Sequence, residues 1–164
     1  KIDLNLRFFD SEKRLKEELH AFMSCRHQVG LVSREAPLIS NLSVLENIAL
    51  IRQYHSRLSR CRAEELARKC LRRLQLEDLA GRRNPSLREE QRFCVMVLRA
   101  VMLEDSILVL DRPFEMMPAL GESRFLYDII HKVAEMHREC HVFDYFLNER
   151  RYMGGSGHEA ENRT

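Results

Sequence analysis

The sequence places one acidic side chain where it could bind a metal ion. Residues 107–110 form a continuous apolar run, typical of a central parallel strand that is covered on both faces, and Asp111 ends this run. A carboxylate at such a strand end can bind a divalent cation or can act as a hydrogen-bonded structural group. We expect the structural role, because the sequence contains no GxxxxGKS or GxxxxGKT loop whose bound phosphate would complete the metal coordination.

The residue after Asp111 is an arginine, which limits the chemistry at this position. A guanidinium stays protonated at any working pH, so Arg112 cannot act as a general base. We expect Arg112 to form an ion pair with Asp111 or with another carboxylate, and to hold a loop closed.

A second polar cluster lies at the start of a predicted buried helix. Residues 86–89 fit a capping box, and residues 93–103 are apolar nearly all round. Glu89 and Glu90 fall in the first turn, where each carboxylate stabilises the helix by ~0.3–1 kcal/mol. The same charges repel a phosphate at this helix N-terminus, and Arg88 offsets part of that repulsion.

Composition and charge exclude several classes of protein. The 164 residues form about one domain and carry a net charge of +2, which argues against wholesale nucleic-acid binding. No apolar run approaches the ~20 residues of a membrane span, and no signal-peptide pattern opens the chain. The five cysteines are scattered without a CxxC pair, and the seven histidines lack metal-ligand spacing. We therefore expect a cytoplasmic protein with reduced thiols and no metal site.

The hydrophobic pattern predicts an α/β fold with a parallel sheet, because strands alternate with helices. The predicted strands lie at residues 4–9, 28–32, 107–110 and 141–146. Amphipathic helices are predicted at residues 11–23 and 125–136.

A helix-only stretch interrupts this alternation. Ser43 and Glu46 form a capping box at its start, and the stretch continues to about residue 79. We expect a helical subdomain at about residues 43–95, inserted between sheet strands. The whole predicted domain covers residues 1–153, and residues 154–164 form a disordered polar tail.

Basic side chains gather in the second part of the helical stretch. Residues 52–73 contain eight Lys and Arg against two Glu. The solvated face of an ordinary helix explains this pattern. The alternative is a docking surface for an acidic partner, with anionic lipid or nucleic acid less favoured.

Three short runs resemble motifs of the ATP-binding domain of ABC transporters. VGLVSREAPLISNLSVLENIAL (residues 29–50) resembles the Q-loop and the helix after it. LREEQ (residues 87–91), followed by Arg99-Ala100, is similar to the signature LSGGQ, and ILVLDRPF (residues 107–114) resembles the Walker B strand. The order and spacing of the runs also resemble the family, over roughly residues 4–152. The resemblance implies a P-loop-NTPase-like core with an inserted helical subdomain.

The departures from the family pattern fall on the functional positions. The Q-loop glutamine falls at Arg34, and the catalytic glutamate after the Walker B aspartate becomes Arg112. Residues 115–120 lack the D-loop aspartate, and residues 144–146 lack the switch histidine. We therefore predict no catalytic residue in this chain, and we interpret four positions as relics of nucleotide and magnesium binding: Arg34, Gln91, Asp111 and Arg112.

The signature-like segment departs in the same way. Arg88 replaces the serine, and Glu89 and Glu90 replace the two glycines. Only Leu87 and Gln91 match the family motif.

The resemblance leaves three hypotheses open. The first is a degenerate subunit that does not hydrolyse ATP and acts as a scaffold or regulator in a membrane transport complex. Its partner would be a membrane permease or a second ATPase domain, which would hold it at the inner face of a membrane. The residues proposed to contact that partner are Arg34, Glu35, Leu38, Arg57 and Arg60.

The second hypothesis is an ABC transporter ATPase whose P-loop lies upstream of Lys1. Such a protein would use ATP and magnesium and would power transport together with a partner. The third is a soluble α/β binding domain that uses its Arg-rich helix, for example in nucleic-acid regulation.

Overall fold

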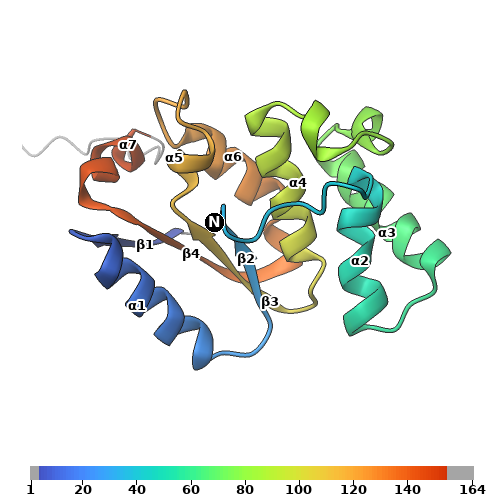
Figure 1. Cartoon of the computed structure of the whole chain (residues 1–164), viewed down its shortest axis with the longest axis horizontal. Helices are drawn as coiled ribbons and strands as arrows, with labels where there is room; N and C mark the ends of the chain where they lie inside the picture. The colour runs from blue at the N-terminus through green and yellow to red at the C-terminus, as the bar shows by residue number, and fades with distance from the viewer. Residues whose placement is uncertain (1–3, 155–164) are drawn as a thin grey trace, which may run out of the picture.

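Four parallel strands form the centre of the molecule. The computed structural model describes residues 4–154, and in that part the strands are β1 (Leu4–Phe9), β2 (Val29–Val32), β3 (Ser106–Asp111) and β4 (His137–Tyr145). They pair in the order β1-β4-β3-β2, so β3 and β4 are internal strands (Figure 1). The predicted α/β fold with a parallel sheet is confirmed.

The strand that carries Asp111 is completely buried. Every residue of β3 is buried, as expected for an apolar run that is covered on both faces. Its register pairs Leu110 with Val32 of β2, and Asp111 with Phe143 of β4. The carboxyl ends of three strands therefore meet around Asp111.

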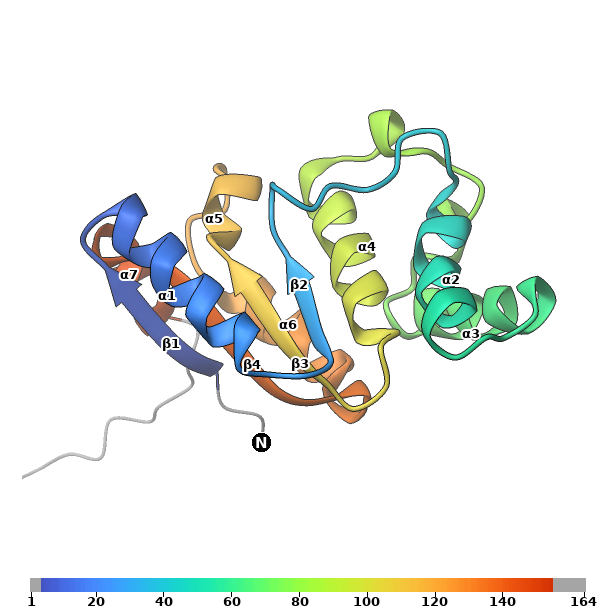
Figure 2. The same ribbon diagram turned by 60° about the horizontal axis from the view of Figure 1, so that its bottom comes forward.

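Helices cover both faces of the sheet. On one face, α1 (Glu12–Ser24) packs its buried stripe against Val109 and Phe143. On the opposite face, α4 (Glu89–Val101) and α6 (Arg124–Lys132) join the larger hydrophobic core (Figure 2). The result is a three-layer arrangement in which the sheet lies between helices.

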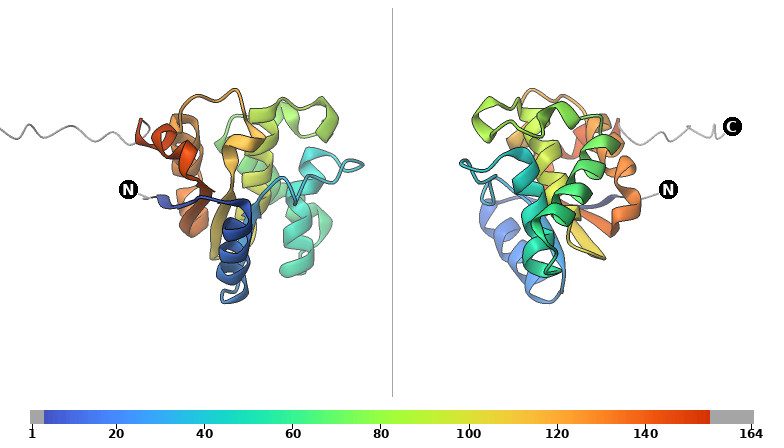
Figure 3. Two further views of the ribbon diagram at one scale, coloured as in Figure 1. Left: turned by 60° about the vertical axis from the view of Figure 1, so that its left-hand side comes forward. Right: turned by 90° about the vertical axis from the view of Figure 1, so that its right-hand side faces the viewer.

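A pair of helices lies beyond α4, on the flank of the molecule. These are α2 (Val44–His55) and α3 (Arg60–Arg73), which pack together and against α4 (Figure 3). The capping box at the start of α2 is confirmed: the Ser43 hydroxyl accepts from the N–H of Glu46 at 3.2 Å, and the Glu46 carboxylate accepts from the N–H of Ser43 at 2.8 Å. The limits that we predict for a helical subdomain and for the whole domain stay predictions.

The remaining elements are short and connect the longer ones. They are η1 (Glu77–Leu79), η2 (Asn84–Ser86), α5 (Pro113–Met116), η3 (Ala134–Met136), η4 (Phe146–Asn148) and α7 (Glu149–Met153). The helix predicted at residues 125–136 ends earlier, at Lys132, and η3 follows it. β4 then begins at His137 rather than at residue 141, because its pairing with β3 already starts at His137, opposite Ser106.

The capping box predicted at residues 86–89 is wrong, because the helix starts later. Ser86 belongs to η2, and its hydroxyl donates to the carbonyl of Arg83 at 2.9 Å. α4 begins at Glu89, so both glutamates of the signature-like segment lie in its first turn, as predicted.

Within residues 4–154, none of the helices has the length and apolar character needed to cross a membrane. The same residues contain no group of three or more His, Cys, Asp or Glu side chains placed to bind a metal ion.

Burial raises the pKa of the Cys94 and Cys140 thiols to about 12, so both are inert at neutral pH. Residues 155–164, most of the predicted polar tail, lie outside the described residues.

The contact between β2 and α4 can be tested at Gly30. A Cβ atom there would lie 2.5 Å from the carbonyl oxygen of Ala100, so the backbone of α4 would have to move. We expect Gly30→Ala to lower the free energy of unfolding by about 1–3 kcal/mol in urea titrations. Gly81→Ala is the matched control, because no atom lies within 4 Å of its Cβ position. Equal stabilities of the two variants would contradict the packing of α4 on β2.

Candidate functional site

The Asp111 carboxylate is buried, and both of its oxygens accept hydrogen bonds. Ser33, directly after β2, donates its hydroxyl to Oδ2 at 2.6 Å. Arg112 donates from Nε to Oδ1 at 2.7 Å and from Nη2 to Oδ2 at 3.1 Å. The ion pair that the sequence predicts is therefore present, in the two-pronged geometry that suits a guanidinium and a carboxylate. The protein itself satisfies the group that could have bound a metal.

The backbone at Arg112 turns the guanidinium back toward Asp111. Arg112 has the left-handed conformation, with φ 47° and ψ 58°, which costs a residue with a Cβ roughly 1–2 kcal/mol. Its N–H donates to the carbonyl of Phe143 at 2.8 Å, and Pro113 then begins α5. The turn lets two adjacent side chains form a buried ion pair, which offsets the strain.

Three further carboxylates surround the Arg112 guanidinium. Glu35 lies 3.5 Å from Nη2, while Glu12 and Glu115 each lie 3.7 Å from Nη1. These three side chains are partly or largely exposed to solvent, so each pair contributes about 0–1 kcal/mol. The bond to Asp111 is the energetically important one.

Hydrogen bonding fixes the charge states around this cluster. The pKa of Arg112 is raised, first by its bond to Asp111 and then by Tyr145, whose hydroxyl lies 3.5 Å from Nη1. Lys16 lies 2.8 Å from Glu12 and 3.3 Å from Glu35. The bond from Lys16 lowers the pKa of Glu12, so this carboxylate is ionised at neutral pH.

The cluster borders a hollow of about 440 Å³ at the carboxyl ends of the strands. Its lining comes from the carboxyl ends of all four strands and the residues after them, and consists of Glu12, Arg34, Glu35, Arg112, Glu115 and Tyr145. Ligands of open parallel sheets bind at this edge. With Asp111 and Lys16 included, four carboxylates oppose three cations at this edge of the sheet. The electrostatics therefore disfavour a polyanion such as a nucleotide.

The helix N-terminus beside this cluster has no phosphate-binding loop. Only Asp10 and Ser11 separate the end of β1 from the start of α1, and neither is a glycine. The Ser11 hydroxyl accepts from the N–H of Arg14, and Glu12 adds a negative charge to the first turn. This short junction gives no room for a cradle of free backbone N–H groups. The sequence alone did not place it next to Asp111, although a strand at 4–9 followed at once by a helix was the available signal.

A second buried carboxylate, Asp144, lies near the end of β4, and the sequence analysis did not identify it. Asp144 accepts from the Tyr152 hydroxyl at 2.6 Å, from the Asn148 side chain at 2.9 Å and from the N–H of Tyr145 at 2.7 Å. Burial, together with the Asp144 charge, raises the pKa of Tyr152. These bonds tie α7 to the sheet in the region where the family resemblance expects the switch histidine.

The chain has relatives of known function, although no family model matches it. The sulfate/thiosulfate import ATP-binding protein CysA of Synechococcus elongatus is 31% identical over 123 residues, which is 73% of this chain and 33% of that protein. CysA 1 of Chromobacterium violaceum is 29% identical over a stretch of the same length. The chain thus spans about a third of the length of the curated relatives it matches.

Solved structures show the same fold. The dimeric bacterial ABC transporter cassette MJ0796 has a TM-score of 0.58 and 24% identity, over 80% of this chain and 57% of that one. A metal-chelate type ABC transporter in an inward-facing conformation has a TM-score of 0.60 and 18% identity, over 84% of this chain and 62% of that one. The chain therefore has an ABC-cassette-like fold, and we refer to it as the cassette-like domain.

The signature-like segment of the cassette-like domain is not assembled with Asp111. Gln91 accepts from the N–H of Arg88 at 3.0 Å, so its side chain serves the helix start. Leu87 is buried in the core. Glu89 borders a different hollow of about 340 Å³, which it shares with Arg34 and residues of α5.

The candidate partner residues of the cassette-like domain fall into two groups. Arg34 and Glu35 are exposed at the strand-end hollow, and Arg57 and Arg60 are exposed at the α2–α3 junction. The expectation that Leu38 contacts a partner is wrong, because its side chain is 4% exposed and packs in the core.

The Asp111–Arg112 pair gives the sharpest stability test of the cassette-like domain. Arg112→Met leaves a buried carboxylate without its cation, so we expect a loss of about 3–5 kcal/mol in the free energy of unfolding. Arg34→Met is the matched control, because its guanidinium lines the same hollow but is exposed and 3.9 Å from Glu115. That variant should change stability by less than about 1 kcal/mol.

A double variant separates the buried charge from lost packing. Adding Asp111→Asn to Arg112→Met removes the uncompensated charge and should recover part of the lost stability. Equal losses for the two methionine variants, or no recovery in the double variant, would show that the pair does not stabilise this edge of the sheet.

Proposed function

We propose that the cassette-like domain is a non-hydrolysing scaffold or regulator in a membrane transport complex. The observation that carries the proposal is the Arg112 guanidinium, which occupies both oxygens of the buried Asp111 carboxylate. Arg112 also falls where the family resemblance expects the catalytic glutamate. Arg112 thus occupies the carboxylate that could bind a metal ion. It also stands where a general base would be needed, and a guanidinium cannot act as one.

The surroundings of Asp111 support the loss of nucleotide chemistry. Phosphoryl transfer needs positioned phosphates and a metal that bridges them. Asp10 and Ser11 leave no cradle at the N-terminus of α1, and Glu12, Glu35 and Glu115 place negative charge where phosphates would have to lie. The residues present do not fit a magnesium nucleotide, so we propose no catalytic step.

The likeness to import ATP-binding proteins supports a role beside a transporter. The curated relatives are named as sulfate/thiosulfate import ATP-binding proteins, and this chain matches a third of their length. We propose that the partner is a membrane permease or a second ATPase domain, which would bring this chain to the inner face of a membrane. The proposed contact points are two sets of exposed residues, Arg34 with Glu35 and Arg57 with Arg60.

The basic helix gives less support to a nucleic-acid role. Several of its cations already pair with carboxylates: Arg60 with Glu46 and Glu64, Arg62 and Lys69 with Glu65, and Arg73 with Glu135. Cations that already pair with carboxylates of the same chain are typical of a solvent-exposed helix face. A surface that binds nucleic-acid phosphates would need unpaired cations.

Calorimetric titration with magnesium and ATP tests the loss of nucleotide binding. We expect no saturable heat up to millimolar ATP, because Asp111 is already paired and the junction before α1 forms no phosphate cradle. Arg112→Glu should restore no ATP turnover, since the cradle would still be missing. Micromolar binding by the 164-residue chain, or measurable turnover in that variant, would overturn the proposal.

Photo-crosslinking in the cells of origin tests the partner. A photoreactive phenylalanine analogue can replace Tyr54, which is 77% exposed and close in sequence to Arg57. We expect a crosslink to a permease subunit or to an ATPase domain from this position, and none from the same analogue at the exposed Lys13 on α1. Crosslinks to nucleic acid alone, or equal products from both positions, would contradict the proposed partner surface.

A further inference from the structure

The strand β2 has an open edge. β2 pairs with β3 on one side, and in the described part of the chain it has no strand on the other. The N–H of Ile107 donates to the carbonyl of Gln28, so Gln28 and Gly30 direct their peptide groups toward β3. The N–H and C=O of one residue point to the same side of a strand, and this side alternates from residue to residue. The N–H and C=O groups of Val29 and Leu31 therefore face the open side.

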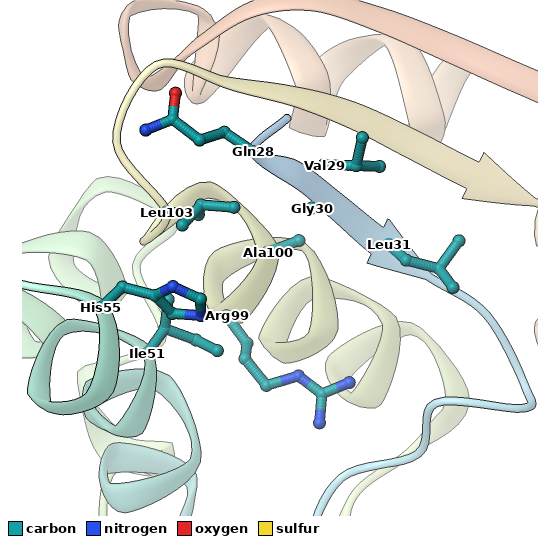
Figure 4. Close-up of a pocket in the computed structure, with 9 residues that line it drawn as sticks. All are labelled: Gln28, Val29, Gly30, Leu31, Ile51, His55, Arg99, Ala100 and Leu103. Carbon is teal, nitrogen blue, oxygen red and sulfur yellow. The ribbon is translucent and has the colours of Figure 1, made fainter. Parts of the chain in front are cut away.

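A groove runs beside this edge. It has a volume of about 340 Å³ and lies between β2 and the C-terminal ends of α2 and α4, as Figure 4 shows. Its walls carry the apolar side chains of Ile51 and Leu103 and the basic side chains of His55 and Arg99. No carboxylate lines it. The groove therefore combines an unpaired strand edge, apolar surface and the positive charge of Arg99.

Arg99 is the polar anchor of this groove. Its guanidinium donates to the carbonyl oxygens of Ala36 and Pro37, which hold it in place but do not neutralise it. None of the ion pairs formed among residues 4–154 includes Arg99. Burial lowers its pKa, a sign that its charge is held partly out of water without compensation. A carboxylate from outside would supply that compensation.

We propose that the open edge of β2 binds a short extended segment of a partner protein that carries an acidic side chain. The segment would form hydrogen bonds with the backbone N–H and C=O groups of Val29 and Leu31. Its carboxylate would be directed toward Arg99 and His55. Strand addition of this kind obtains affinity from backbone hydrogen bonds and specificity from alternate side chains. The proposal does not depend on the proposed function, because it uses neither the strand-end hollow nor the Asp111 cluster.

Charge favours a different protein over a second copy of this chain. Two β2 edges brought together would place the basic side chains of both grooves close to each other, with no carboxylate in either groove to separate them. An acidic segment removes that repulsion. Self-association through β2 is thus an outcome that would overturn the proposal.

A phage-displayed library of random ten-residue peptides provides the probe. We expect the wild-type protein to enrich peptides in which Asp or Glu is flanked by alternating β-branched residues. Leu31→Pro removes an open-edge N–H without touching the pairing to β3, and should weaken the selected peptides at least tenfold. Leu31→Val is the matched control, because it loses side-chain packing but keeps the N–H, and it should bind within about threefold of wild type.

Two further measurements keep the test independent of the proline variant. On the wild-type protein, a bound peptide should slow hydrogen exchange of the Leu31 N–H, and replacing its acidic residue by the amide should weaken it about tenfold. Failure to enrich acidic peptides, exchange protection at another surface, or a concentration-dependent dimer that Leu31→Pro abolishes would each overturn the proposal. Loss of binding to permeases or to ATPase domains would instead bear only on the proposed function.

Discussion

The carboxylate of Asp111 is buried at the centre of the sheet's carboxyl edge, 3% exposed, and hydrogen bonds from Ser33 and Arg112 compensate its charge. A buried carboxylate without a partner is costly, and proteins satisfy it with a cation and hydrogen bonds or change its charge state. In this chain the cation is the guanidinium of the next residue, held by a left-handed turn, and the last hydrogen bond comes from Ser33. No ligand is needed to complete the arrangement.

This compensation links segments that are far apart in the sequence. Ser33 joins the loop after β2 to β3, while Glu35 and Glu12 bring the same loop and the start of α1 to the Arg112 guanidinium. On the other side of the loop, Arg99 bonds the carbonyls of Ala36 and Pro37. The loop between the sheet and the α2–α3 pair is thus fixed by the chain's own charges. In a domain with the ABC-cassette fold, these contacts hold the loop after β2 against both the sheet and α4.

Local sequence patterns predicted the features that depend on interactions between residues close together in the sequence. The apolar run before Asp111 predicted a strand buried on both faces, Ser43 and Glu46 predicted the start of α2, and the adjacency of Arg112 and Asp111 predicted their ion pair. The start of α4 was misplaced, because Ser86 bonds into η2 instead of capping the helix. Pattern alone could not choose between two local hydrogen-bonding arrangements of similar strength.

Long-range contacts were beyond the reach of the sequence. The bonds from Ser33 to Asp111 and from Tyr152 to Asp144 depend on strand order and on where the C-terminal helix packs. The burial of Leu38 and the position of the β1–α1 junction beside the Asp111–Arg112 pair likewise follow from tertiary packing, although the shortness of that junction was visible in the sequence. These are the contacts that occupy the Asp111 carboxylate and the end of β4.

The heteronuclear NMR signal of the Arg112 Nε–H group tests the central claim most directly. If the guanidinium is locked on Asp111, this signal is sharp and slow to exchange with water at neutral pH, and saturating magnesium and ATP leave its position unchanged. A signal lost to rapid exchange, or one that shifts in a saturable way with magnesium and ATP, would show that Asp111 is free to bind a metal and would contradict the account.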